Sequence, residues 1–233
     1  MYVMLRNLPV VTCMTESALF PWTVVMPVKV LARAKSRLAL LAGPRRSELA
    51  LALASDTVSA VVACPEVARV LVVTSDAVAG PRLAALGAHV VGGEPGGAAG
   101  GLNAALSYGA SVATTRWPGG GIAALAADLP ALRPSELGRA LRAVAITGAA
   151  AFVPDAAGVG TTMYAAGPGG TFRPLFGGAS RARHASSGAV ELSLDGVPGL
   201  RRDVDTPEDL RAVVMLGAGF RTVAVAEELL ADA

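Results

Sequence analysis

Short apolar runs alternate along the chain with longer segments in which apolar residues recur at helical spacing. The run from Thr23 to Val28 is too short for a helix, rich in β-branched residues and uncharged, so it predicts a strand buried on both faces. Arg45 to Ala63 predicts the first long helix, and Val67 to Thr74 a second buried strand. A short helix ending near Leu86 then leads to a third strand, His89 to Val91. This order of elements is typical of a right-handed parallel α/β sheet.

The second half of the chain keeps one further buried strand and then changes character. Ile122 to Ala127 predicts the fourth apolar strand, and Pro134 opens another helix. After Ala149 the pattern becomes β-rich, with strands expected at Ala151–Asp155, Gly158–Tyr164 and Ala189–Leu194 joined by glycine turns. We therefore predict an α/β fold of the three-layer, Rossmann-like kind, with a mostly parallel sheet and a β-rich insertion in the C-terminal half.

Length and composition fit one domain. The chain has 233 residues, and we expect residues 1–21 to be a loose extension that carries no chemistry and residues 22–233 to form a single domain. Mean hydropathy is +0.53, but alanine and valine inflate it, and no stretch of 18 apolar residues lacks a charge or a glycine. We expect no transmembrane helix and no membrane partner.

Charge and cysteine content narrow the function further. A formal net charge of +2 with 4% aromatic residues argues against a nucleic-acid surface, which needs clustered cations and stacking rings. Cys13 and Cys64 are the only cysteines and support neither a disulfide framework nor a zinc site, so a reducing cytoplasm is the expected location. The chain has neither Gly-x-Gly-x-x-Gly after the first strand nor a phosphate-binding loop of the Gly-x-x-x-x-Gly-Lys type, which disfavours dinucleotide dehydrogenases and phosphate-loop NTPases.

A loop rich in cations follows the first strand. Lys29, Arg33, Lys35 and Arg37 come directly after it, and the carboxyl edge of an open α/β sheet is where ligands bind. Lysine neutralises a polyanion as a point charge and arginine holds two oxygens at once, so a triphosphate suits this loop. The alternative is a solvated basic loop that precedes a helix.

Two glycine-rich stretches extend the set of candidate ligand contacts. Gly92 to Gly101 leads into a helix on which Asn103 could read a base edge or a ribose, unless the stretch is a surface loop and Asn103 an ordinary helix residue. The second stretch, Phe176 to His184, combines glycines, a hydroxyl, Arg181 and Arg183 at the start of a helix, and predicts a second anion site.

Three aspartates are candidates for a metal site. Asp128 ends the fourth strand and is followed by Leu129-Pro130, which suits either a metal ligand or a helix cap. Asp203 and Asp205 lie two residues apart, so on an extended segment both carboxylates point to one face. At a separation of about 4 Å and an effective dielectric near 20 they repel by roughly 4 kcal/mol, which a divalent cation would reverse. Asp205 could instead serve the helix start at Thr206-Pro207.

Taken together, these motifs resemble one family, the phospholactate and phosphoenolpyruvate guanylyltransferases of deazaflavin coenzyme biosynthesis. The matching segments run in order from Trp22 to about Gly217; they are Pro27-Val-Lys29, Ala34-Lys-Ser-Arg-Leu38, Leu102-Asn103, Asp128-Leu-Pro130, Gly160-Thr-Thr162, Phe176 to His184, and Asp203 to Leu210. The family is similar to the molybdenum-cofactor guanylyltransferase and to GT-A sugar-nucleotide enzymes, which implies the nucleotide-diphospho-sugar transferase type of fold. Departures from the family pattern are Gly178-Ala179 before Ser180 and the unmatched residues 1–21.

The resemblance implies an enzyme that transfers GMP from GTP to a phosphorylated three-carbon acid and releases diphosphate. It assigns Mg²⁺ to Asp128, Asp203 and Asp205, and the acceptor to Thr162, Gly177 and Ser180. Lys29, Lys35 and Arg37 would take the GTP phosphates, and Asn103 the nucleotide. The product would feed the transferase that builds the coenzyme's side chain.

Several alternatives stay open at this point. A GT-A type sugar-nucleotidyl or glycosyl transferase and a non-catalytic nucleotide-binding module could share the scaffold, although a dead module should have lost one of the three aspartates. The motifs do not distinguish phosphoenolpyruvate from 2-phospholactate or 3-phosphoglycerate as the acid. The apolar segment from Leu216 to Leu230 offers a surface for a homodimer.

Overall fold

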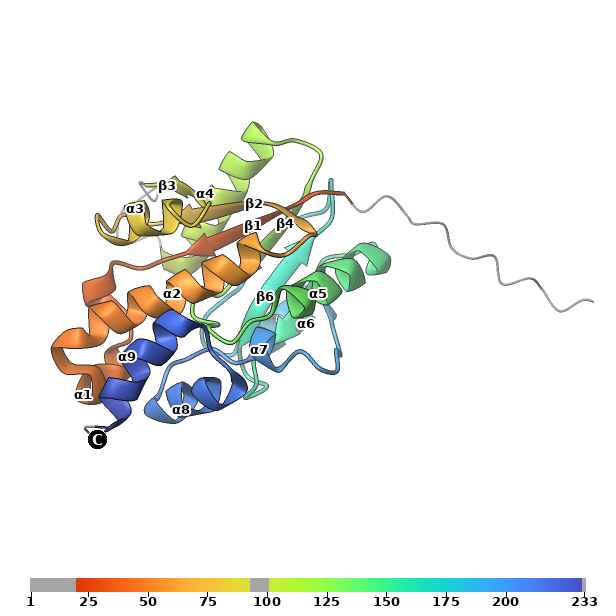
Figure 1. Cartoon of the computed structure of the whole chain (residues 1–233). Helices are drawn as coiled ribbons and strands as arrows, with labels where there is room; N and C mark the ends of the chain where they lie inside the picture. The colour runs from red at the N-terminus through yellow and green to blue at the C-terminus, as the bar shows by residue number, and fades with distance from the viewer. Residues whose placement is uncertain (1–19, 93–100, 232–233) are drawn as a thin grey trace, which may run out of the picture.

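The sheet has seven strands in the order β3-β2-β1-β4-β6-β5-β7 (Figure 1). The structure is a computed structural model that describes residues 20–92 and 101–231. The strands are β1 Trp22–Pro27, β2 Val67–Val73, β3 His89–Val91, β4 Gly121–Leu125, β5 Ala151–Pro154, β6 Thr161–Ala166 and β7 Val190–Glu191. Within the described residues, β6 is the one strand that runs against the others, antiparallel to both β4 and β5.

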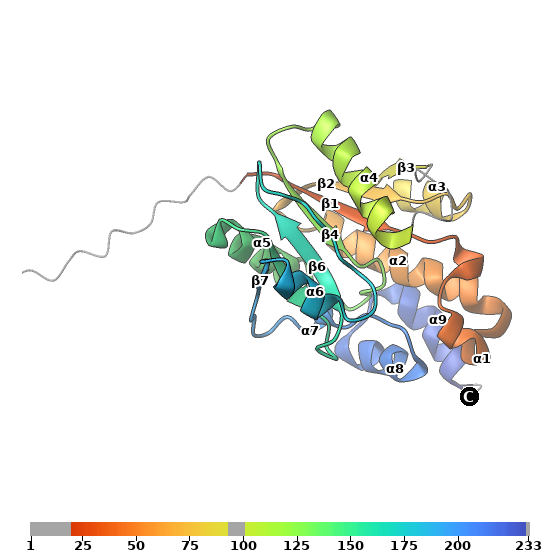
Figure 2. The same cartoon turned by 180° about the vertical axis from the view of Figure 1, so that it is seen from behind.

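Helices cover both faces of this sheet. The α-helices are α1 Ala39–Ala42, α2 Arg46–Val62, α3 Ala79–Ala84, α4 Gly101–Arg116, α5 Pro134–Thr147, α6 Ser180–Ser186, α7 Pro198–Arg201, α8 Pro207–Leu216 and α9 Phe220–Ala231, with short 3-10 turns at Leu31–Arg33, Ser36–Leu38 and Gly43–Arg45. One face carries α2, α3 and α5, and the view from behind in Figure 2 shows α4 and α6 on the other. The predicted three-layer, mostly parallel α/β fold is therefore confirmed.

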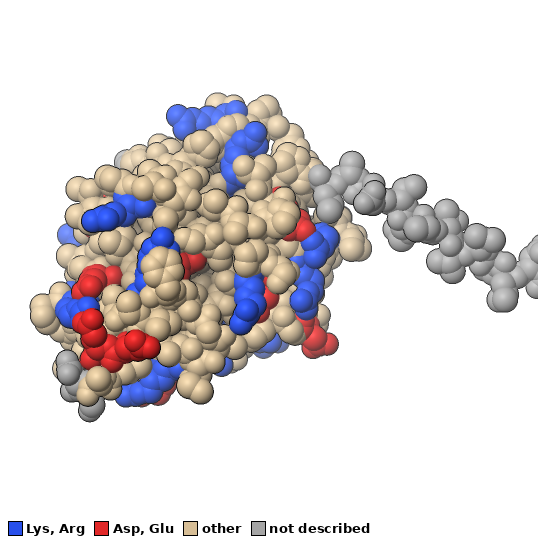
Figure 3. All heavy atoms as spheres, viewed as in Figure 1, with Lys and Arg blue, Asp and Glu red and all other residues tan. Residues whose placement is uncertain are grey.

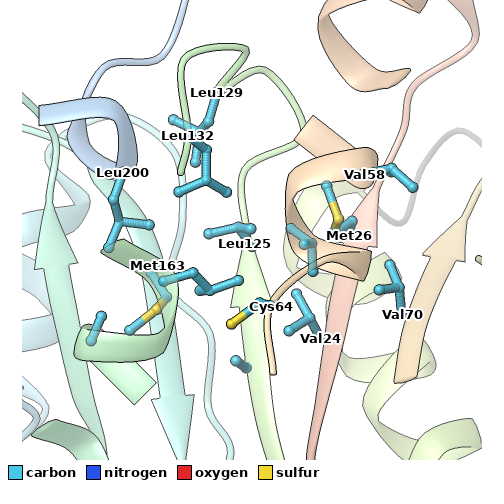
Figure 4. Close-up of a cluster of buried hydrophobic side chains, with 14 of the residues drawn as sticks. Val24, Met26, Val58, Cys64, Val70, Leu125, Leu129, Leu132, Met163 and Leu200 are labelled. Atoms are coloured by element: carbon cyan, nitrogen blue, oxygen red, sulfur yellow. The ribbon is translucent and has the colours of Figure 1, made fainter. Parts of the chain in front are cut away.

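Alternation along β1 explains why this strand lies at the centre. Trp22, Val24 and Met26 pack into the core under α2 and α5, whereas Val25 packs into the core under α4. Figure 4 shows the first of these cores, where Val24 and Met26 meet side chains from neighbouring strands and from α2. A strand buried on both faces carries mostly apolar and no charged residues, as the sequence of this run predicts.

The later strands are shorter than the sequence predicts. The strand expected from Gly158 starts at Thr161, because the Asp155 carboxylate accepts the backbone N–H groups of Val159 and Gly160 at 2.9 and 2.8 Å and so holds those residues in a turn. Only Val190–Glu191 of the predicted strand at Ala189–Leu194 forms a ladder, at the edge of the sheet.

The C-terminal segment folds back onto the first long helix. Val225, Ala226 and Leu229 of α9 pack with Leu49 and Leu53 of α2 in a third core cluster. Most of the apolar surface expected between Leu216 and Leu230 is thus used within the chain, while Phe220 remains 72% exposed.

The termini of the described chain and its surface complete the picture. Phe20 packs its ring 4.9 Å from that of Trp22, and the Pro21 carbonyl accepts the Gly121 N–H at 3.0 Å, so Phe20 and Pro21 belong to the folded part.

None of the helices in residues 20–92 and 101–231 is long and apolar enough to cross a membrane. On the face shown in Figure 3, basic and acidic side chains are interspersed.

Candidate active site

A cavity of about 650 Å³ opens at the carboxyl ends of β1 and β4. Residues that follow these two strands line it, and so does Thr161 at the start of β6. Because β6 runs antiparallel to β4, its first residues reach the same sheet edge at which β4 ends. The loop before α6 closes another side of the cavity. Segments from both halves of the chain therefore converge where ligands bind in open α/β sheets.

Most of the residues predicted for the site lie in this cavity. Those that line it are Lys29, Lys35, Arg37, Asp128, Gly177, Ser180, Asp203 and Asp205. Asn103 and Thr162 do not line it. Arg33, Ser36, Asp155 and Thr161 line it in addition.

Lys35 is the centre of the charged part of the cavity. Its ammonium pairs with the carboxylates of Asp128 and, at 3.1 Å, Asp205, while its side chain is only 10% exposed. Burial lowers the pKa of Lys35, but the two carboxylates outweigh burial and leave that pKa above its usual value. Among the described residues it is also the one non-glycine residue with a positive φ, +53°. A left-handed lysine is strained, and such strain is often retained at functional sites.

The other cations of the loop are more open. The Arg37 guanidinium lies 3.6 Å from Asp205 and is 74% exposed, and Lys29 and Arg33 are exposed on the cavity wall. The Leu31 N–H donates to Asp76 at 2.8 Å, which fixes the path of the loop after β1. This cavity thus presents cations that remain accessible to a polyanion.

Backbone hydrogen bonds bring the aspartates together from distant parts of the sequence. The Leu129 N–H donates to the Thr57 hydroxyl at 3.0 Å, which fixes the turn after β4. The Val204 N–H donates to the Asp128 carbonyl at 3.2 Å, so the segment with Asp203 and Asp205 runs beside Asp128. These contacts explain how residues about 75 positions apart share one cavity wall.

Neither helix-cap alternative for the aspartates holds. The N-cap of α5 is Arg133, and the N-cap of α8 is Thr206, whose hydroxyl accepts the Asp209 N–H at 3.2 Å. Asp128 and Asp205 instead direct their carboxylates at Lys35. Both are therefore placed for cleft chemistry rather than for helix initiation.

Asp203 is the most perturbed acid of the site. Burial, followed by the carboxylates of Asp128, Asp205 and Asp155, raises its pKa to about 7. Clustered acids in a cavity favour a bound cation, and oxygen-only donors suit Mg²⁺. In the described part of the chain, however, no three acidic, histidine or cysteine side chains stand close enough to hold a metal ion, and the Lys35 ammonium fills the space between two of the acids. The carboxylate oxygens of Asp128, Asp203 and Asp205 are the type of ligand that suits Mg²⁺, but they do not converge on one point.

Asn103 acts on the loop before α6. Its side-chain N–H donates to the Phe176 carbonyl at 3.0 Å, and its side-chain oxygen accepts the Phe176 N–H at 2.8 Å. Both the N–H and the oxygen of this amide are thus bound to the backbone of Phe176. The geometry does not support the expected contact between Asn103 and the nucleotide. Its role here is to fix Phe176 and the adjacent Gly177.

Two further expectations change with the geometry. Thr162 is fully buried and its hydroxyl faces the Val153 carbonyl at 3.5 Å, whereas its neighbour Thr161 faces the cavity, because successive strand residues point to opposite faces. Of the second anion site predicted over Phe176 to His184, Gly177 and Ser180 line the cavity, but Arg181 and Arg183 are not on its wall and bind groups of the chain itself. Arg181 binds Glu191 through two contacts of 2.8 Å, and Arg183 donates to carbonyls of the Leu175–Gly177 loop.

The order of the sheet and the position of the cavity at its carboxyl edge give the chain the fold of the nucleotide-diphospho-sugar transferases. A solved structure of a protein assigned to that class from Desulfovibrio desulfuricans superposes with a TM-score of 0.66, over 91% of this chain and 94% of the other. Sequence identity is 17%, so this likeness bears on the fold alone.

The chain belongs to the phosphoenolpyruvate guanylyltransferase family. It is 59% identical to the phosphoenolpyruvate guanylyltransferase of Streptomyces coelicolor over 210 residues, which cover 90% of this chain and 97% of the relative. It is 55% identical to that of Thermomonospora curvata over 215 residues, which cover 92% of each chain. No protein-family model matches the chain.

Proposed function

We propose that the chain transfers GMP from GTP to phosphoenolpyruvate and releases diphosphate. The observation that carries the proposal is that three acids, several cations and the Gly177–Ser180 wall meet in one cavity. The names of its relatives add support, since they are phosphoenolpyruvate guanylyltransferases at more than half identity over most of the chain. Both substrates are anionic, which suits a cavity edged by lysine and arginine.

The reaction needs no general base from the protein. The phosphate of the acceptor is already ionised near neutral pH, and one of its oxygens attacks the α-phosphorus of GTP. A new phosphorus–oxygen bond forms there, and the bond from the α-phosphorus to the bridging oxygen breaks, so that diphosphate leaves. His89 packs against Trp117 and His184 is buried, so neither imidazole is offered to the cavity. Positioning and charge neutralisation must therefore supply the rate enhancement.

We assign the cations to the triphosphate. Lys29 and Arg37 are exposed at the cavity wall and would bind its terminal phosphates, and Lys35 would neutralise charge near Asp128 and Asp205. Gly177 and Ser180, on the wall made by the α6 loop, would hold the acid. Asn103 would support that wall through Phe176 rather than contact GTP itself.

We assign Mg²⁺ to Asp128, Asp203 and Asp205. When bound, the ion would neutralise phosphate charge at the α-phosphorus and on the leaving diphosphate. The three acids line one cavity, and the pKa of Asp203 is raised by burial and then by the neighbouring carboxylates, whose negative charge a cation would balance. On this proposal the guanylylated acid then serves the transferase that builds the side chain of the deazaflavin coenzyme.

Diphosphate release tests the proposed function. The full chain is incubated with GTP and Mg²⁺, with phosphoenolpyruvate, 2-phospholactate, 3-phosphoglycerate or no acid. We expect release that depends on an acid and is fastest with phosphoenolpyruvate. Release that requires a sugar 1-phosphate instead would make the chain a sugar-nucleotidyl transferase, and binding of GTP with no release under any condition would make it a non-catalytic nucleotide-binding module.

A further inference from the structure

His184 is held rigidly beside the cavity. Its ring is fully buried, stacked 4.8 Å from Tyr164 at an interplanar angle of 19°, and it meets Phe152 and Phe176 at 5.4 Å each. Three aromatic contacts fix the plane of the ring, because tilting it would open a void in a close-packed region.

The hydrogen bonds of this ring fix its tautomer. The Leu175 N–H donates to Nε2 at 2.9 Å, so Nε2 carries no hydrogen. Burial and, to a smaller extent, the nearby Arg183 lower the pKa of His184 to about 4, which keeps the ring neutral near pH 7. A neutral imidazole whose Nε2 is an acceptor carries its hydrogen on Nδ1.

The tautomer in turn fixes the Thr161 hydroxyl. Nδ1 lies 3.0 Å from Thr161 Oγ1, and since Nδ1 is the donor, the hydroxyl oxygen accepts and cannot give its own hydrogen to the ring. Among the described residues, no other hydrogen bond of this hydroxyl is found. Thr161 is 8% exposed and lines the cavity, so its hydrogen is left to a ligand there.

We propose that His184 makes the Thr161 hydroxyl a dedicated donor to an acidic oxygen of the phosphorylated acid. Thr161 is then a substrate-binding residue of the acceptor subsite, and His184 is a positioning residue that acts through it. This inference rests on the proposed function.

The wall on which Thr161 lies favours the acceptor over GTP. The adjacent turn is fixed, because Asp155 holds the Val159 and Gly160 N–H groups and Arg181 donates to the Gly158 carbonyl at 3.0 Å. Thr161 follows this turn, near the α6 loop, whereas the exposed cations follow β1. A hydrogen bond from a fixed donor to an anionic oxygen is roughly twice as strong as one to a neutral oxygen.

Steady-state kinetics with both substrates test the Thr161 contact. Thr161→Val keeps the shape and removes the donor, and it should raise KM for phosphoenolpyruvate about 10- to 100-fold, the range expected for a lost hydrogen bond to a charged group, with KM for GTP changed less than about threefold. Thr161→Ser should restore most of the affinity. Thr115→Val makes the same chemical change on an exposed turn of α4 and should match the wild type.

The positioning role of His184 needs a coupled measurement. His184→Phe keeps the aromatic packing and removes the Nδ1 donor, so it should raise KM for phosphoenolpyruvate in the wild-type background and have no further effect in the Thr161→Val background. His184→Asn, which keeps a donor near the Nδ1 position, should be the milder variant. Melting temperatures identify any variant that fails to fold, and the other histidine variant then replaces it.

The outcomes separate the inference from the proposed function. If wild type shows no acid-dependent diphosphate release, the proposed function fails, and the Thr161 contact with the acid fails with it. If wild type is active but Thr161→Val leaves KM for phosphoenolpyruvate unchanged, or raises KM for GTP instead, the Thr161 contact is wrong. Independent, multiplicative effects of His184→Phe and Thr161→Val would overturn the positioning role.

Discussion

At the scale of single residues, Lys35 connects the charged groups of the cavity. Its ammonium lies between Asp128 and Asp205, and its left-handed backbone conformation is maintained against the usual steric cost. Lys35 therefore supplies a counter-charge to Asp128 and Asp205. In the described part of the chain, no ion pair with Asp203 is found. This difference makes Asp203 the acid most in need of an added cation.

Replacing Asp128 or Asp203 by asparagine should lower activity without destabilising the fold. We expect Asp128→Asn and Asp203→Asn each to lower kcat by at least about 100-fold at ordinary Mg²⁺, because an amide cannot balance a divalent charge. Circular dichroism melting should show little loss of stability. Asp195→Asn, in an exposed loop outside the cavity, is the matched control. Full activity of either site variant would remove that residue from the metal site.

His184 should also make stability depend on pH. Its pKa in the folded state, about 4, is below its ordinary value of 6.5, so folding favours the neutral ring. The contribution of this ring to the free energy of unfolding should be fully present above pH 6.5 and should fall by up to about 3 kcal/mol as pH falls toward 4.

Denaturant unfolding of wild type and His184→Phe at pH 4.5 and 7.5 measures this term. Other groups, Asp203 included, titrate in both proteins, so the difference between the two chains isolates the ring. Arg183 is the charged group nearest to it and opposes its protonation. An equal loss of stability in both proteins would show that His184 does not titrate as described.

At the scale of elements, α9 depends on a carboxylate from α2. Asp56 is buried and accepts the Thr222 N–H at 2.7 Å, in the first turn of α9, and it pairs with Arg221 at 3.2 Å. Gly219 lies so close that an added Cβ would stand 2.3 Å from the Asp56 carboxyl carbon. The start of α9 is thus tied to the middle of α2.

Removing this carboxylate should loosen the C-terminal helix. Asp56→Ala should lower the free energy of unfolding by about 2 to 3 kcal/mol, because a buried N–H and a guanidinium both lose their acceptor. Asp56→Asn, which keeps an acceptor, should cost less. Urea unfolding compares the two, and an equal effect of both variants would mean that charge alone matters. KM values should change little, since Asp56 is outside the cavity.

The elements also show what a sequence can and cannot predict. Local sequence patterns are enough to predict β1, from its uncharged run, and α2, from its helical spacing. The bounds of both elements were predictable to within a residue or two. The choice between Thr161 and Thr162 depends on where Asp155 ends the preceding turn, which no local pattern reveals. Likewise, Arg181 is turned away from the cavity by Glu191, ten residues later on another element.

At the scale of the whole molecule, the site exists because one strand runs backwards. The antiparallel β6 delivers Thr161 to the edge at which β4 ends, and the segment after α7 returns Asp203 and Asp205 to the same edge. Most residues of the cavity could be predicted from the sequence, because they directly follow predicted strands, and the carboxyl ends of parallel strands meet at one edge of the sheet. It could not predict that Asn103 holds Phe176 in place, which depends on a contact 73 residues apart.

The N-terminal boundary gives a test at this scale. Removing residues 1–19 should leave melting temperature and turnover unchanged, as a segment without apolar periodicity predicts. Removing residues 1–20 also deletes Phe20, whose ring packs on Trp22, and should lower the melting temperature by a few degrees, about 1 kcal/mol of stability. A large loss on removing only residues 1–19 would mean that this segment contributes to the core.

Direct observation of the product tests the central proposal most closely. Phosphorus NMR of the full chain with GTP, phosphoenolpyruvate and Mg²⁺ should show GTP converted to equal amounts of diphosphate and a new phosphoric anhydride that joins GMP to phosphoenolpyruvate, with Asp203→Asn inert under the same conditions. Release of GMP without the anhydride, or GTP left intact, would contradict guanylyl transfer to this acid.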